Sequence, residues 1–163
     1  MNRMLRSVAR WAGVWTGQAS FNETATALMR NEICPIFEGR AVSMDFEVYE
    51  PAGMQLVYGV RTVLAPDLDG SLKTLSFSTR FGLVQLEQTP DDEDVLALTG
   101  VTDEGVKLTV TMLPQDRDHM QLSAIWRPVG AGAASEEVQG VNGLLRRVTI
   151  WKPGAPMPDV ARR

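Results

Sequence analysis

Few residues of this chain combine the types and spacing that catalysis or metal binding requires. It has one histidine, His119, and one cysteine, Cys34. No serine elbow, phosphate loop or dinucleotide motif is present, and no His/Cys/Asp cluster has metal-ligand spacing. Asp67 and Asp69 in PDLDG resemble part of a calcium loop, but a hairpin turn explains them better. We therefore expect no catalytic residues, no metal and no cofactor, and the sequence favours a non-enzymatic role.

His119 is the one candidate for a haem ligand. In HMQLSAIW it has the opposite parity to Met120, Leu122 and Trp126, so it should point away from the apolar face of its strand. Haem ligation by His119 is accordingly disfavoured. Cys34 has no base near it in the sequence and is interpreted as a small buried hydrophobe.

The arginines are stronger candidates for polar chemistry. Arg61 and Arg80 lie in otherwise apolar strands, and Arg146 and Arg147 are adjacent in the last expected strand. An arginine inside a small barrel must be paired, because an unpaired buried charge is very costly. Such a side chain could hold a ligand carboxylate through two hydrogen bonds or stack on a tryptophan, and we favour stacking. The alternation leaves open which of Arg146 and Arg147 points inward.

Alternation of apolar and polar residues predicts the strands that position these side chains. Strands are expected at 41–50, 54–64, 71–81, 83–89, 94–102, 106–112, 119–126 and 143–152. The turns between them, such as Pro51-Ala52-Gly53, are too short for crossover helices, so neighbouring strands should pair antiparallel. Residues 24–37 fit a strand or a short amphipathic helix, and we favour a strand.

This pattern predicts an all-β protein, an antiparallel up-and-down β-barrel of about 8–10 strands with a short N-terminal segment capping one end. We expect one domain over residues 1–153 and an irregular C-terminal tail over 154–163. The net charge of −4 argues against binding to nucleic acid or to an anionic membrane surface. The single cysteine, the lack of an apolar signal core and the lack of a long apolar run predict a cytoplasmic bacterial protein.

A short motif opens the first expected strand. The segment GVWTG at 13–17, with the meander and an arginine on the last strand, resembles the calycin superfamily of lipocalins and fatty-acid-binding proteins. Gly39-Arg40 before an alternating strand is most similar to bacterial lipocalin-like proteins of unknown function, the DUF1579 type. The resemblance implies a lipocalin-like barrel over roughly residues 11–152, in which a tryptophan packs with an arginine of the final strand. The residues assigned to this barrel closure are Trp15, Gly13, Gly17 and Arg147.

The inward faces of the expected strands predict binding of a small apolar or amphipathic molecule inside the barrel. The expected ligand-binding residues are Met44, Phe46, Leu56, Tyr58, Phe77, Met112, Leu122, Trp126 and Arg146. One alternative is an enzyme acting on a lipid-like substrate in the same cavity. Others are haem binding of the nitrobindin kind, or a homodimer formed through a barrel edge or the 24–37 segment. A further alternative is a barrel whose interior is filled by its own side chains and binds no ligand.

Overall fold

The computed structural model describes residues 2–22, 24–89, 94–130 and 139–150. The expected fold is confirmed, with ten strands and one short helix in this part of the chain. The elements are α1 (Arg3–Arg10), β1 (Gly13–Phe21), β2 (Ala25–Ile36), the 3-10 turn η1 (Phe37–Gly39), β3 (Ala41–Tyr49), β4 (Leu56–Pro66), β5 (Leu72–Ser78), β6 (Gly82–Gln88), β7 (Leu96–Val101), β8 (Val106–Pro114), β9 (His119–Pro128) and β10 (Gln139–Ile150). The segment 24–37 therefore forms a strand for most of its length, as favoured. The expected tail at 154–163 lies outside the described residues.

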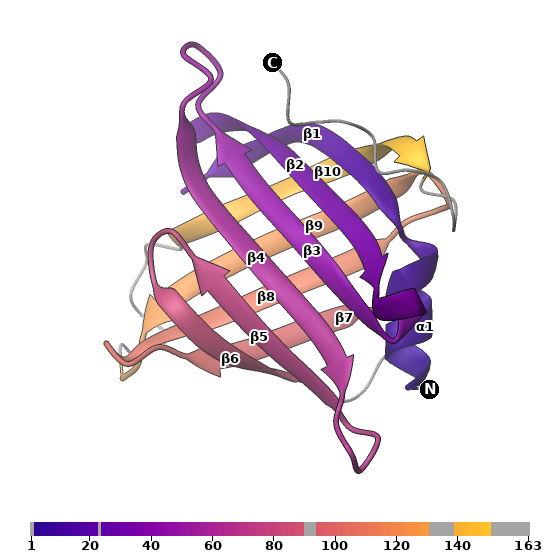
Figure 1. Cartoon of the computed structure of the whole chain (residues 1–163). Helices are drawn as coiled ribbons and strands as arrows, with labels where there is room; N and C mark the ends of the chain where they lie inside the picture. The colour runs from indigo at the N-terminus through magenta and orange to yellow at the C-terminus, as the bar shows by residue number, and fades with distance from the viewer. Residues whose placement is uncertain (1, 23, 90–93, 131–138, 151–163) are drawn as a thin grey trace.

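The strands form a closed antiparallel barrel (Figure 1). Each strand pairs with its neighbours in sequence, and β1 also pairs with β10 to close the ring. Closure satisfies the backbone groups that an open sheet would leave at its edges. The homodimer through a barrel edge or the 24–37 segment stays a prediction.

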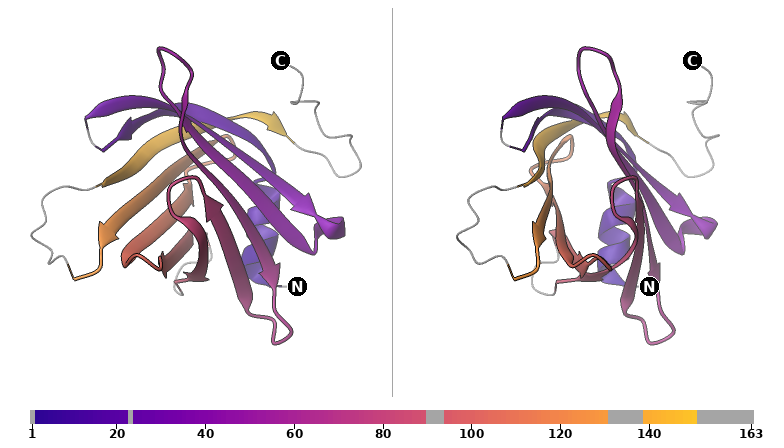
Figure 2. Two further views of the ribbon diagram at one scale, coloured as in Figure 1. Left: turned by 60° about the vertical axis from the view of Figure 1, so that its left-hand side comes forward. Right: turned by 90° about the vertical axis from the view of Figure 1, so that its left-hand side faces the viewer.

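The expected N-terminal cap is the helix α1, which lies across one end of the barrel (Figure 2). It begins where the Asn2 side chain accepts a hydrogen bond from the backbone N–H of Leu5, at 3.2 Å. Met4, Leu5 and Val8 recur at helical spacing and are buried against the barrel end formed by β2, β3 and β4. We call this the closed end, and the opposite rim the mouth.

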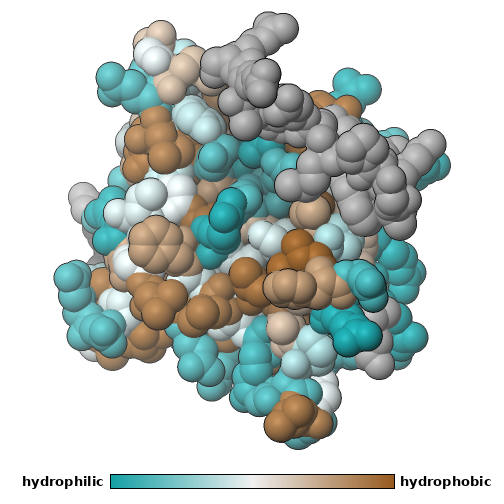
Figure 3. Space-filling view, viewed as in Figure 1, coloured by the Kyte–Doolittle hydropathy of each residue, from teal (hydrophilic) through white to brown (hydrophobic). Residues whose placement is uncertain are grey.

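The expected inward face of β5 is wrong. On β5 the inward residues are Thr74, Ser76 and Ser78, whereas Phe77 is 59% exposed on the outer surface. The register with β4 sets this parity, because Ser78 pairs with Val60, whose side chain points inward. Figure 3 shows hydrophobic side chains gathered on the outside of the barrel, on the face formed partly by β4, β5 and β6.

Leu56 and Arg146 are also outside the interior, against expectation. Leu56 is 50% exposed, because the β3–β4 register shifts between Val48 and Tyr49, and this bulge reverses the alternation ahead of Tyr58. Arg146 is exposed because the inward residues of β10 are those of odd number, such as Leu145. Its proposed place among the ligand-binding residues is therefore wrong.

Candidate functional site

The closed end is occupied by the chain's own aromatic and cationic side chains. Trp15 is fully buried, and its indole Nε1 donates to the Trp11 carbonyl at 2.8 Å. The Arg147 guanidinium carbon lies 4.4 Å from the Trp15 ring centroid, and Nη2 donates to the Arg10 carbonyl at 3.3 Å. Burial lowers the pKa of Arg147, and the Asp118 carboxylate partly offsets this. Of the two adjacent arginines it is Arg147 that stacks on the tryptophan.

Two glycines of β1 meet different backbone requirements near this seam. A Cβ on Gly17 would lie 2.2 Å from the carbonyl oxygen of Leu144 on β10, so the two strands could not approach with any larger residue there. Gly13 has φ +137°, a conformation that L side chains rarely adopt. Gly17 therefore permits the close passage of β1 and β10, and Gly13 permits the positive φ at the start of β1.

A cavity lies between the inward faces of the barrel. Its volume is about 40 Å³, which is enough for roughly three water molecules at about 10–15 Å³ each. Of the expected ligand-binding residues, five line it, and they are Met44, Phe46, Tyr58, Met112 and Leu122. The full lining adds residues that are mostly small or apolar, namely Asn31, Val60, Thr62, Ser76, Ser78, Gly82, Val84, Leu86, Leu108, Val110 and Ala124.

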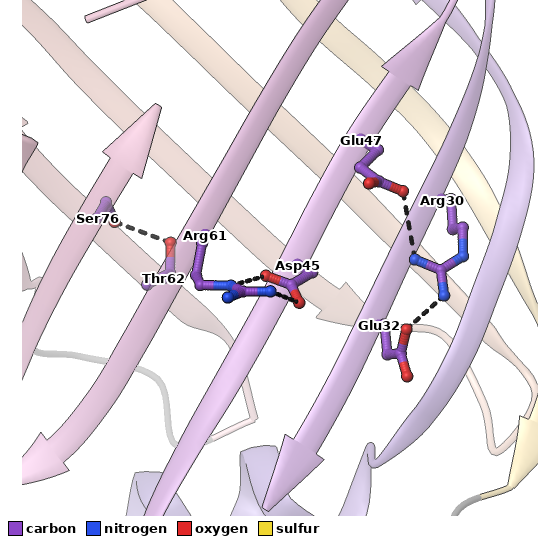
Figure 4. Close-up of polar contacts among 7 residues, drawn as sticks. All are labelled: Arg30, Glu32, Asp45, Glu47, Arg61, Thr62 and Ser76. Atoms are coloured by element: carbon purple, nitrogen blue, oxygen red, sulfur yellow. Dashed lines mark hydrogen bonds and ion pairs between the residues drawn. The ribbon is translucent and has the colours of Figure 1, made fainter. Parts of the chain in front are cut away.

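The cavity wall includes polar residues that the alternation analysis did not select. Thr62 Oγ1 and Ser76 Oγ lie 2.8 Å apart on adjacent strands, and both side chains are buried (Figure 4). Asn31 on β2 is 1% exposed. The alternate spacing of Thr74, Ser76 and Ser78 indicates a polar inward face. The prediction favoured the opposite face because Leu75 and Phe77 are more hydrophobic.

Aromatic rings separate this cavity from the mouth of the barrel. The Tyr58 ring lies 5.3 Å from Trp126 and 6.4 Å from Phe81, and the Phe81 and Trp126 centroids are 5.7 Å apart. Burial raises the pKa of Tyr58 to about 12, although a hydrogen bond with Ser78 and the charge of Arg80 oppose the shift. The phenol is therefore neutral at any physiological pH. We call Tyr58, Phe81 and Trp126 the aromatic layer.

A second hollow lies outside the aromatic layer. It has a volume of about 400 Å³, within the roughly 300–1,000 Å³ typical of small-molecule sites. The Arg80 guanidinium carbon lies 5.2 Å from the Trp126 ring centroid, and Trp126 Nε1 donates to Gln139 Oε1 at 3.1 Å. We call this hollow the mouth pocket, and it is lined by Arg80, Phe81, Glu104, Val106, Trp126, Pro128 and Gln139.

Charged side chains of the same strands lie on the outer surface in ion pairs. Arg61 donates from Nε and Nη2 to the two carboxylate oxygens of Asp45, at 2.6 and 2.8 Å (Figure 4). Arg30 contacts Glu32 and also Glu47, the latter at 3.3 Å. None of the residues that line the interior cavity is charged.

The lone histidine stands outside the barrel, as its parity predicts. His119 Nδ1 lies 3.0 Å from Asp116 Oδ2, and the His119 side chain is 42% exposed. Among the described residues, no three His, Cys, Asp or Glu side chains could together hold a metal ion. Cys34 is half-buried and shares the outer face with its partner Ser43, so its interpretation as a small buried hydrophobe is wrong. No helix in the described ranges is long and apolar enough to cross a membrane.

Comparison with known proteins identifies the fold. No family model matches the chain, and no curated protein matches it either. Rv2717c from M. tuberculosis is 13% identical, with a TM-score of 0.58 over 88% of this chain and 96% of that one. The S-type phycobiliprotein lyase CPES from Guillardia theta is 12% identical, with a TM-score of 0.53 over 90% and 92%.

At these identities the similarity concerns the fold alone. The described part of the chain is a closed ten-stranded β-barrel, a fold consistent with the expected calycin-like architecture. The finer resemblance to the DUF1579 type finds no support in a family model and stays a prediction.

Proposed function

We propose that this protein binds a small, largely apolar molecule in the barrel, without catalysis, and that the molecule enters through the mouth. The observation that carries the proposal is a single aromatic layer between two hollows. Tyr58 lines the interior cavity, Trp126 lines the mouth pocket, and their ring centroids are 5.3 Å apart. Rotation of a ring in this layer would join the two hollows into one site.

The chemistry of the lining supports an apolar ligand. Most of the cavity wall is aliphatic, aromatic or methionine side chain, and Met44 and Met112 can adapt their shape to an irregular guest. The interior cavity alone holds only a few waters, so a larger ligand must displace the aromatic layer toward the mouth. At the closed end Trp15 is fully buried and Arg147 stacks on its ring, which supports entry from the mouth.

A fluorescent probe tests this proposal. N-phenyl-1-naphthylamine is neutral and brightens in apolar surroundings, so its emission should rise saturably when it is titrated with the protein. Ala124 lines the cavity, and Ala124→Leu should fill the space and weaken probe binding at least tenfold. Ala97→Leu is the matched control, because Ala97 lies on the outer face of β7 and does not line the cavity.

Two results would contradict the proposal. Emission that fails to saturate would show that the wild-type barrel has no discrete site. Equal probe affinity in Ala124→Leu and wild type would place the probe on the outer surface, where Phe77 and Leu83 are exposed. Circular dichroism of both variants verifies that the barrel is intact.

A further inference from the structure

The interior cavity is lined by a buried amide that has no hydrogen-bond partner among the described residues of the protein. Asn31 is 1% exposed, lines the cavity, and neither its Nδ2 nor its Oδ1 has a hydrogen-bond partner. Its partners in the barrel register are Trp15 and Phe46. The Trp15 indole already donates to the Trp11 carbonyl, and Phe46 has no polar atom. The protein itself therefore leaves this amide unsatisfied.

An unsatisfied buried amide destabilises a fold. A buried donor or acceptor without a partner is less stable than one that is hydrogen-bonded, because it has lost its bonds to water and gained none in the protein. A leucine has nearly the same shape as asparagine and would avoid this cost. The neighbouring inward residues of β2, Met29 and Ile33, are apolar. Asn31 is therefore a single polar residue on this part of the inward face, and it lies in the wall of the cavity.

Hydroxyl groups line the same cavity from other strands. Thr62 and Ser76 bond to each other, which uses one of their two protons and leaves one donor and several lone pairs. The polar groups that line the cavity thus include an amide and this hydroxyl pair, beside the hydroxyls of Tyr58 and Ser78. All are neutral, because the arginines and carboxylates of these strands lie on the outer surface, as Arg61 and Asp45 do.

We propose that the cavity receives an uncharged ligand end that carries both a hydrogen-bond donor and an acceptor, a carboxamide or lactam, which pairs with the Asn31 amide. An amide edge complements both Nδ2 and Oδ1. A carboxylate would leave Oδ1 unpaired and would bury a charge without a counter-charge, which is far more costly. The rest of the ligand would be apolar and would lie toward the aromatic layer. This inference rests on the proposed binding function and names the class of its ligand.

Octanamide and octanoate form a matched pair for the test, since they share a tail and differ in the polar end. The test measures how well each compound displaces N-phenyl-1-naphthylamine from the protein at pH 7.5. The inhibition constants are corrected for the probe affinity of each variant. We expect octanamide to bind about tenfold or more tightly than octanoate. Asn31→Leu should lower that preference several-fold by weakening octanamide binding, without abolishing it, because the charge of octanoate remains costly to bury. Asn142→Leu, on the outer face of β10, should keep the wild-type preference.

Thermal unfolding without ligand supplies a second measurement. Asn31→Leu should raise the melting temperature by several degrees, because it removes the unsatisfied amide. Equal inhibition by the two ligands, an unchanged preference in Asn31→Leu, or a lower melting temperature for that variant would each overturn the inference. These failures differ from failure of the proposed function, in which the probe itself shows no saturable binding to the wild-type protein.

Discussion

Trp15 and Arg147 are directly opposite each other in the register of β1 and β10, and the guanidinium carbon of Arg147 lies 4.4 Å from the Trp15 ring centroid. The two strands come from opposite ends of the described chain, so this contact holds the seam that closes the barrel. The same guanidinium donates to the carbonyl of Arg10, the last residue of α1. One side chain therefore joins the helix, the first strand and the last strand.

Loss of this stacking should weaken the fold. We expect Arg147→Gln to lower the free energy of unfolding by about 1–2 kcal/mol, through the lost cation–π contact and the lost packing of the arginine stem. Arg146→Gln is the control, because Arg146 is exposed, and it should change stability by less than about 0.5 kcal/mol. Urea unfolding followed by circular dichroism gives both values. Equal effects would contradict a special role for Arg147.

The close passage of β1 and β10 gives a second prediction. Gly17→Ala should destabilise the barrel by about 3 kcal/mol, since its Cβ would meet a backbone carbonyl rather than a mobile side chain. Gly59→Ala should change stability by no more than about 1 kcal/mol, because the nearest atoms to its Cβ are side-chain carbons at 3.5 Å. Thermal and urea unfolding of the pair measures the contrast. A Gly17→Ala protein as stable as Gly59→Ala would contradict the tight seam.

Two phenylalanines that were both expected inside the barrel should now behave differently. Phe46 is 8% exposed and lines the cavity, so Phe46→Ala should cost about 3–4 kcal/mol. Phe77→Ala should cost less than about 1 kcal/mol, since its ring is mostly in water. The free energy of unfolding of each variant tests the parity of β5. A large loss of stability in Phe77→Ala would contradict this orientation and indicate that the ring is buried in the core.

The buried phenol of Tyr58 predicts how stability depends on alkaline pH. Its pKa is raised to about 12 in the folded protein by burial, against about 10 in the unfolded chain. The unfolded state therefore loses its proton first, and stability that is fully present below pH 10 falls by up to about 3 kcal/mol as the pH rises to 12. Urea unfolding of wild type and Tyr58→Phe at pH 9.5 and 11.5 isolates this contribution, because other groups titrate alike in both.

An optical titration checks the same assignment. In a Tyr49→Phe background, the absorbance at 295 nm reports Tyr58 alone, and its midpoint should lie well above pH 10. A midpoint at the ordinary value would mean that the aromatic layer leaves the phenol open to water.

Sequence reasoning predicted much of the architecture, because alternation on β3 and β9 is strong and both strands keep a single inward face. Met44, Phe46 and Leu122 were placed correctly for that reason. It failed on β5, where local hydrophobicity favoured Phe77 while the register with β4 turned Ser76 inward. In the closed barrel, the register with the neighbouring strand decides which alternate residues point inward. The sequence of one strand alone does not give that register.

The site was harder to predict than the fold. A bulge between Val48 and Tyr49 reversed the face of Leu56, and bulges leave little trace in a sequence. The cavity and the ring contacts of Trp126 depend on rotamers, which side-chain packing decides across several strands. Asn31 could have been noticed as the one amide between Met29 and Ile33, but only a closed barrel shows that nothing satisfies it.

The order in which the strands pair has a consequence for how the chain is made. Nine of the ten strand pairings join neighbours in sequence, and the tenth joins residues 13–21 to residues 141–150. As the chain leaves the ribosome, each hairpin can form in turn, because its two strands are close along the chain. β1 and β9, however, both keep an open edge until residues 139–150 have been synthesised. During most of its synthesis the nascent sheet therefore has two open edges, at which it could pair with other nascent chains, whereas the closed ring pairs β1 with β10.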